Sequence, residues 1–137
     1  MRITQETDYA LRVVLFLANL GYGEKIDAKT ISDREVIPLR FLLKLLRKLT
    51  NSGILTSYRG VNGGYALNRE PKHITLKDVI EAIEGPIYVN RCLYDKELCT
   101  AKKNGECVVH ITLSKVQKTI NKELEEINFE KLINGDI

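Results

Sequence analysis

The sequence predicts a mainly α-helical fold with one small β-hairpin. Three successive segments repeat apolar residues at helical spacing, a glycine-rich hairpin pattern follows them, and a longer helical pattern closes the chain. The length of 137 residues suits one compact domain, or a small domain with an appended helix, and excludes a barrel enzyme or a two-domain catalyst. No apolar run is long enough to span a membrane and no signal peptide is recognisable, so we expect a cytoplasmic protein without membrane contact.

The first two predicted helices are amphipathic. One spans residues 8–20 and ends before Gly21, and the other spans residues 28–35 with Asp27 as its N-cap and Ile31 on its inner face. The apolar stripe of the first helix comprises Leu11, Val14, Leu15, Leu17 and Ala18. Both helices are therefore expected to bury one face against a common core.

The third predicted helix spans about residues 38–52 and places Pro38 at its first position, where the missing N–H needs no partner. The residues predicted to be buried are Phe41, Leu42, Leu45, Leu46 and Leu49. The residues predicted on the opposite face are Arg40, Leu43, Lys44 and Arg47. Two short helices joined by a tight turn, the second with a basic face, form the helix-turn-helix arrangement, whose second helix enters the major groove of DNA.

A β-hairpin is predicted directly after the third helix. Residues 54–59 alternate as a strand does, residues 60–64 form a glycine-rich turn, and residues 65–67 return. Such a hairpin is the wing of a winged helix-turn-helix domain, which we assign to residues 1–72. This part carries twelve Lys and Arg against seven Asp and Glu, a net charge of +5, whereas residues 73–137 carry −2. The charge predicts an anionic partner for the first part.

The predicted partner is double-stranded DNA. Arg40 and Lys44 suit guanine or phosphate, Leu43 suits a thymine methyl group, Arg47 and Lys48 suit phosphates, and Arg59 suits a narrow minor groove. An ordinary solvated cationic face is the alternative for the helix alone, and the wing favours DNA binding. The residues predicted to contact DNA are Tyr9, Pro38, Leu39, Arg40, Leu43, Lys44, Arg47, Arg59, Asn62 and Gly63.

Residues 73–137 are predicted to form a linker helix, a cysteine loop and a dimerisation helix. Thr75 opens the linker helix with a capping box, and Gly85 ends it. The last helix begins at about Val108, and its narrow apolar seam comprises Leu113, Val116, Ile120, Leu124 and Ile127. Such a seam suits pairing with a second copy, so we expect a homodimer that binds a palindromic operator.

The cysteine loop has the spacing Cys92-x6-Cys99-x7-Cys107-x2-His110. An odd number of cysteines in one short stretch is a poor disulfide framework, and metal or redox chemistry fits better. Structural zinc sites usually contain C-x2-4-C pairs, which this loop lacks, so its wide spacing favours an iron–sulfur cluster. Zinc, or oxidation of the thiols themselves, remains the alternative. No positioned third group completes a Cys–His pair, so we do not expect an enzyme.

The whole chain resembles the iron–sulfur-responsive winged-helix transcription regulators typified by IscR and NsrR. The matching segments are Met1-Arg2-Ile3-Thr4 with Tyr9-Ala10-Leu11-Arg12, residues 42–53, Arg59-Gly60 with Gly63-Gly64-Tyr65, residues 74–85, and the three cysteines. The resemblance implies a dimeric regulator, most simply a repressor, whose 2Fe-2S or 4Fe-4S cluster alters its affinity for DNA in response to nitric oxide, redox state or iron.

The resemblance also implies the cluster ligands. Cys92, Cys99 and Cys107 match the three cysteine ligands of the family. For the fourth ligand, His110 matches the histidine that follows the last cysteine in IscR-like proteins, whereas Asp8 matches the aspartate that the partner subunit supplies in NsrR-like proteins. We favour His110, because its proximity to Cys107 does not depend on a dimer.

Overall fold

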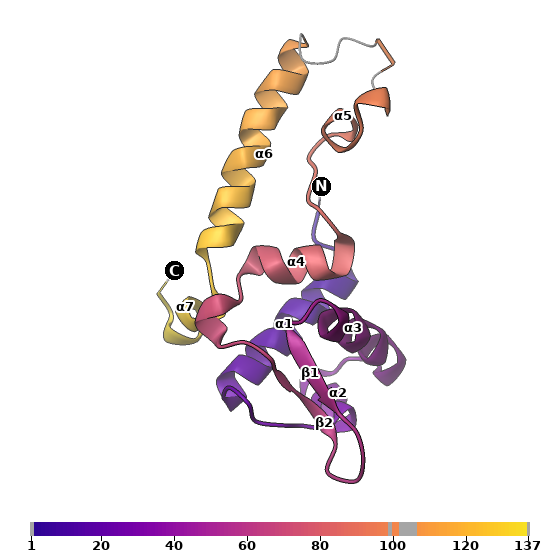
Figure 1. Ribbon diagram of the computed structural model, residues 1–137, viewed down its shortest axis with the longest axis vertical. Helices are drawn as coiled ribbons and strands as arrows, with labels where there is room; N and C mark the ends of the chain where they lie inside the picture. Colours follow the sequence, from indigo (N-terminus) through magenta and orange to yellow (C-terminus); the bar gives the residue numbers. More distant parts are fainter. Residues whose placement is uncertain (1, 99, 102–106, 137) are drawn as a thin grey trace.

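The computed structural model describes residues 2–98, 100–101 and 107–136. It contains seven α-helices, two short 3-10 helices and a two-stranded sheet in these residues (Figure 1). The elements are α1 (Gln5–Leu20), α2 (Ala28–Glu35), α3 (Leu39–Asn51), β1 (Leu55–Tyr58), β2 (Gly64–Leu67), η1 (Pro71–His73), α4 (Leu76–Glu84), α5 (Arg91–Tyr94), η2 (Lys96–Leu98), α6 (Val108–Glu126) and α7 (Phe129–Asn134). The predicted mainly helical fold with one hairpin is confirmed.

Capping hydrogen bonds set where the first two helices begin. α1 begins earlier than predicted, at Gln5, because the Thr4 hydroxyl accepts a hydrogen bond from the Thr7 N–H at 3.2 Å. α2 has the predicted bounds, and the Asp27 carboxylate accepts from the Thr30 N–H at 3.0 Å. Hydrogen bonds from Thr30 hold the pKa of Asp27 below its usual value. Each cap satisfies a backbone donor that has no partner within its own helix.

α3 buries a stripe that is narrower than predicted. The buried residues of this helix are Leu42, Leu45, Leu46 and Leu49. The prediction that Phe41 belongs to this stripe is wrong: the residue is 47% exposed, and the Arg40 guanidinium lies 4.9 Å from the centre of its ring. Phe41 immediately precedes Leu42, so the 100° turn per residue carries it past the edge of the stripe. Pro38 is not at the predicted first helical position but is the N-cap residue just before the helix, with an extended ψ of 130°.

The wing is an antiparallel hairpin in which Leu55 pairs with Leu67 and Tyr58 pairs with Gly64. A bridge between Ile26 and Tyr65 ties it to the segment before α2, with backbone hydrogen bonds of 3.0 and 2.8 Å in the two directions. Gly64 has a φ of 157°, and a Cβ atom there would lie 2.6 Å from the Ile26 carbonyl oxygen. Only glycine therefore allows this close approach of the two backbones.

The hydrophobic core includes residues beyond the predicted winged helix-turn-helix part (residues 1–72). α4 and α7 both pack on α1, and Val79 and Phe129 are completely buried in the same cluster as the first three helices. A backbone bridge joins Thr75 to Asn128, so the chain leaves and re-enters this core at one place. The division into a DNA-binding domain (residues 1–72) and a second part with the linker helix, cysteine loop and dimerisation helix (residues 73–137) stays a prediction.

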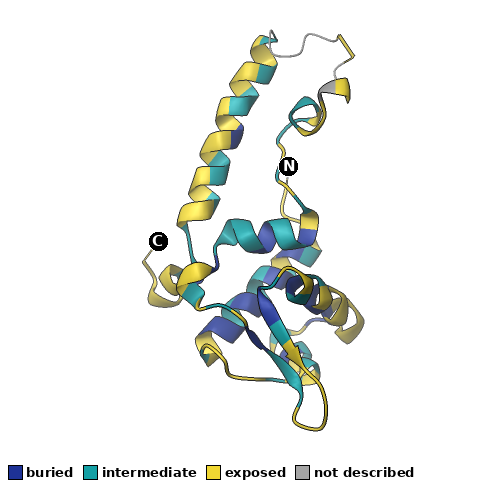
Figure 2. Cartoon of the chain, in the orientation of Figure 1, coloured by how far each residue is buried: buried dark blue, intermediate teal, exposed yellow. Residues whose placement is uncertain are grey.

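An arm projects from this core. It consists of the strap (residues 85–90), α5 and α6, and α6 rises away from the other helices with mostly exposed side chains (Figures 1 and 2). Val116 in the predicted seam is exposed, Leu113, Ile120 and Leu124 are half-buried, and α6 ends before Ile127. Across the part of the chain that the structure describes, no helix is long and apolar enough to cross a membrane.

We expect Gly64→Ala to lower the free energy of unfolding by about 3 kcal/mol, because the new methyl group meets the Ile26 carbonyl in addition to the strain at positive φ. Gly60→Ala is the matched control: its φ is 97°, but no described atom lies within 4 Å of the added Cβ, and we expect a cost of about 1 kcal/mol. Urea unfolding followed by circular dichroism measures both, and equal losses would contradict the steric argument.

Candidate functional site

A cysteine and a histidine meet in the arm. Cys92 lies on α5 and His110 lies in the first turn of α6, eighteen residues later, and the His110 Nδ1 atom is 3.2 Å from the Cys92 Sγ atom. Both residues are half-buried, and α5 packs against α6. The structure thus brings together two of the predicted metal ligands, from the two sides of the arm.

The other two predicted cysteine ligands lie between Cys92 and His110 in the sequence. Cys107 is the half-buried N-cap residue of α6, three residues before His110, and its backbone there is extended, not helical. It does not form a cluster of three with the described residues Cys92 and His110. Cys99 lies outside the described residues. Among residues 2–98, 100–101 and 107–136, no group of three or more His, Cys, Asp or Glu side chains comes together as a metal site.

The Cys92–His110 pair fits the donor chemistry of a metal ligand set. Tetrahedral coordination by one sulfur and one imidazole nitrogen separates the two ligand atoms by roughly 3.5 Å, given usual bond lengths of about 2.3 and 2.0 Å. The observed separation of 3.2 Å lies close to that value. A small rotation of either side chain would let both atoms bind one metal ion.

Asp8 lies apart from this pair. It is in the first turn of α1, its side chain is 59% exposed, and it lies 3.9 Å from the Arg12 guanidinium. Since Asp8 forms no cluster with Cys92 and His110 among the described residues, one chain does not assemble it into the site. Its role as a ligand supplied by a partner subunit stays a prediction.

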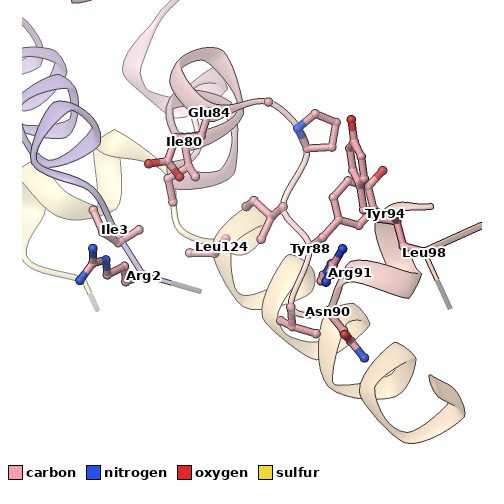
Figure 3. A pocket seen from close by; sticks show the side chains of 14 residues that line it. Arg2, Ile3, Ile80, Glu84, Tyr88, Asn90, Arg91, Tyr94, Leu98 and Leu124 are labelled. Atoms are coloured by element: carbon pink, nitrogen blue, oxygen red, sulfur yellow. The ribbon is translucent and has the colours of Figure 1, made fainter. Parts of the chain in front are cut away.

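A cavity of about 430 Å³ separates the arm from the N-terminal segment. Tyr88, Arg91 and Tyr94 of the strap and α5 line one side, and Arg2 and Ile3 line the other (Figure 3). The rings of Tyr88 and Tyr94 are arranged edge to face, with centroids 5.2 Å apart. The strap therefore faces a hollow on this side.

The predicted DNA-contacting residues lie on or beside α3 and on the wing, except for Tyr9, which lies on α1. On or beside α3, the exposed ones are Pro38, Leu39, Arg40, Leu43, Lys44 and Arg47. On the wing, Arg59 and Asn62 are exposed and Gly63 is half-buried, where a Cβ atom would collide with the Tyr58 carbonyl. Tyr9 packs partly against the core, and the Arg12 guanidinium lies 5.5 Å from the centre of its ring.

Lys48 has a role that sequence reasoning missed. Its ammonium group lies 2.9 Å from the Glu6 carboxylate of α1 and donates to the Ile83 carbonyl of α4 at 3.4 Å. Glu84 lies nearby, and its pKa is lowered, first by a hydrogen bond from the Thr4 side chain and also by the charge of Lys48. No local spacing signals such a contact between helices. Lys48 links α3 to both α1 and the end of α4.

Residues 3–135 match the family model named Rrf2 and described as iron-dependent transcriptional regulator. The chain belongs to the Rrf2 family. An HTH-type transcriptional regulator IscR from Xenorhabdus nematophila is 30% identical over 135 residues, which cover 98% of this chain and 80% of that protein. This Rrf2 chain is therefore a transcriptional regulator, and the expectation that it is not an enzyme agrees with its relatives.

Solved structures show the same winged-helix fold. The structure of CymR, described as the global cysteine regulator of B. subtilis, has a TM-score of 0.74 and 29% identity and covers 96% of this chain and 95% of that chain. An IscR structure from T. potens has a TM-score of 0.76 and 23% identity, over 100% of this chain and 89% of that one. The predicted winged helix-turn-helix fold and family resemblance are confirmed.

We expect Lys48→Met to lower the free energy of unfolding by about 1–2 kcal/mol, because it leaves a buried oxygen of Glu6 without its cation. Lys44→Met makes the same chemical change at an exposed position of α3 and should alter stability by less than about 0.5 kcal/mol. Urea unfolding at neutral pH compares the two. Equal effects would mean that the Lys48–Glu6 pair contributes nothing.

Proposed function

We propose that this Rrf2-family regulator binds double-stranded DNA as a homodimer and that an iron–sulfur cluster in the arm controls its affinity for a palindromic operator. The observation that carries the proposal is the contact of Cys92 with His110, since it unites a soft thiolate donor and an imidazole from segments eighteen residues apart. The family description as iron-dependent and the relatives named IscR support the same assignment.

The proposed ligands are Cys92, Cys99, Cys107 and His110. Three thiolates and one imidazole suit iron in a 2Fe-2S or 4Fe-4S cluster, and such a cluster supplies a centre that nitric oxide, oxygen or iron shortage alters. Asp8 of a partner subunit is the rival fourth ligand. His110 is favoured, because its nitrogen already lies beside Cys92 within one chain.

The proposed dimer uses α6. Val116 is exposed on this helix, and Ile111 is 42% exposed, so apolar side chains of α6 lack cover from their own chain. Two copies packed along α6 would bury them and relate the two recognition helices by a two-fold axis. A two-fold axis in the protein matches the symmetry of a palindromic operator.

In the proposed DNA complex, α3 lies in the major groove and the wing lies along the minor groove. Arg40, Lys44 and Arg47 supply positive charge on the exposed face of α3, and Leu43, 41% exposed between them, supplies an apolar contact. Arg59 at the end of the first wing strand supplies the minor-groove contact. Repression follows if the operator overlaps a promoter.

A second candidate is regulation through the thiols without a cluster, or with zinc in its place. The Cys92–His110 contact also suits a redox-responsive thiol or a zinc ligand pair, and the structure with 29% identity is named a global cysteine regulator. The two candidates predict different colours. A cluster gives a brown protein containing iron and sulfide, whereas a zinc or thiol protein is colourless.

We expect wild-type protein purified without oxygen to contain iron and sulfide, and we expect Cys92→Ala to lose both together with the visible absorption. His110→Ala should lose its cluster faster than wild type by about tenfold or more, since a ligand is removed. Visible spectra with iron and sulfide assays measure these changes.

His73→Ala is the matched control for that experiment, because His73 is exposed on η1 and outside the arm. This variant should keep a wild-type spectrum. Asp8→Ala decides the fourth ligand: rapid cluster loss in Asp8→Ala, with retention in His110→Ala, would transfer the role to Asp8. A colourless wild type with stoichiometric zinc would establish the second candidate.

We expect Leu43 to recognise a thymine methyl group in an operator selected from random DNA by the wild-type protein. Replacing the contacted thymine by uracil should weaken wild-type binding by roughly fourfold, the equivalent of one buried methyl group. Leu43→Ala should bind both duplexes equally, as measured by fluorescence anisotropy. Leu20→Ala, an exposed change at the end of α1, should keep the wild-type preference, and its loss there would contradict the assignment.

A further inference from the structure

Gln117 is a buried polar side chain on α6, next to an exposed apolar residue. It is 9% exposed, whereas Val116 beside it is 43% exposed. The usual pattern of an amphipathic helix would place an apolar residue at such a buried position. Burying an amide costs free energy unless hydrogen bonds satisfy its donor and acceptor groups. The hydrogen-bond partners of Gln117 therefore indicate its role.

The partners of Gln117 are backbone groups of the strap. Its Oε1 atom accepts a hydrogen bond from the Val89 N–H at 2.7 Å, and its Nε2 group donates to the Ile87 carbonyl. The same Nε2 group also donates to the Asn121 side chain, one turn further along α6, at 3.2 Å. The amide therefore holds a donor and an acceptor of the strap at once, and Asn121 helps to fix its orientation.

The position of Gln117 relates it to the Cys92–His110 contact. Gln117 follows His110 by seven residues, two turns of α6, so the two side chains share a face and lie about 10.5 Å apart along the helix axis. On the strap side, Val89 precedes Cys92 by three residues, which span at most about 10–11 Å. The chain from Val89 to Cys92 is thus at most about as long as the two turns of α6 from Gln117 to His110, and it is shorter where α5 begins at Arg91. A strap held at Gln117 can thus place Cys92 beside His110.

We propose that Gln117 is a positioning residue that sets the register of the strap on α6 and thereby brings Cys92 to His110. The chemistry of that pair rests on the proposed function, whereas the register does not. A slip of the strap by one helical turn would move Cys92 by about 5.4 Å and separate it from His110. A hydrophobic residue at position 117 would cover the strap without specifying this register, because apolar contacts have no direction.

The first test compares cluster retention. Gln117→Met keeps the length of the side chain but removes its hydrogen bonds to the strap, and Lys118→Met is the exposed control on the next residue of α6. We expect the cluster of Gln117→Met to be lost to a chelator about tenfold faster than that of wild type, the usual size of an effect beyond the ligands themselves. Lys118→Met should match wild type, and both should keep the wild-type melting temperature within a few degrees.

The second test needs no iron. In a full-length chain carrying His110→Cys, Cys99→Ser and Cys107→Ser, Cys92 and the introduced thiol can form a disulfide, with glutathione disulfide as the oxidant. Adding Gln117→Met should slow this intramolecular reaction about tenfold, because the effective concentration of the two thiols falls. Adding Lys118→Met should leave the rate unchanged. Mass spectrometry after alkylation of free thiols measures the rate.

Together, the two tests distinguish a failure of the positioning role of Gln117 from a failure of the proposed cluster. A colourless wild type with a slower disulfide in Gln117→Met would overturn the proposed function and support the positioning role. A brown wild type, with rates of cluster loss and disulfide formation that Gln117→Met leaves unchanged, would support the proposed function and overturn the positioning role. If Gln117→Met does not fold, Asn121→Ala replaces it: loss of the Asn121 contact should slow disulfide formation about threefold, and an unchanged rate would overturn the proposal.

Discussion

The rest of the structure depends on the place where the chain leaves and re-enters its core. The Leu76 N–H donates to the Ile127 carbonyl at 3.0 Å and the Phe129 N–H donates to the Ile74 carbonyl at 3.0 Å. Ile74 and Phe129 are both completely buried. These bonds hold both ends of the long excursion from α4 to α6 against α1. Both ends of the arm are therefore anchored at one place on the core.

α4 lies between α3 and the arm. It packs on α1, on α3 and on α6, and the strap begins where it ends. Lys48 connects α3 to the last turn of α4 through the Ile83 carbonyl, so α3 is linked to the end of α4 from which the strap begins. If a cluster in the arm alters the affinity for DNA, DNA must alter the retention of the cluster by the same factor, because the two equilibria are linked.

Local signals predicted the fold well, and contacts between distant segments were the part that sequence reasoning missed. The Asp27 cap, the Thr75 capping box and the hairpin each depend on residues within a few positions of one another, and the structure shows all three. The Lys48–Glu6 pair joins two helices whose relative placement the sequence pattern does not fix. Gln117 resembles an ordinary polar residue of an exposed helix until its strap partners are known. Sequence reasoning missed α7 for the same reason: its Phe129 packs into a core formed by helices far from it in the sequence.

Gln117 and the proposed ligands both fix how the strap and α5 align with α6, but at different positions along the arm. Its hydrogen bonds hold the strap to α6 near the middle of that helix, and a cluster bound by Cys92 and His110 would join α5 to α6 nearer its tip. The Gln117 hydrogen bonds do not involve the proposed ligands, so removing a cluster would leave them in place. Under the proposed function, a cluster would add its binding free energy to a strap already held on α6, and it would favour the arrangement in which α5 lies against the first turn of α6.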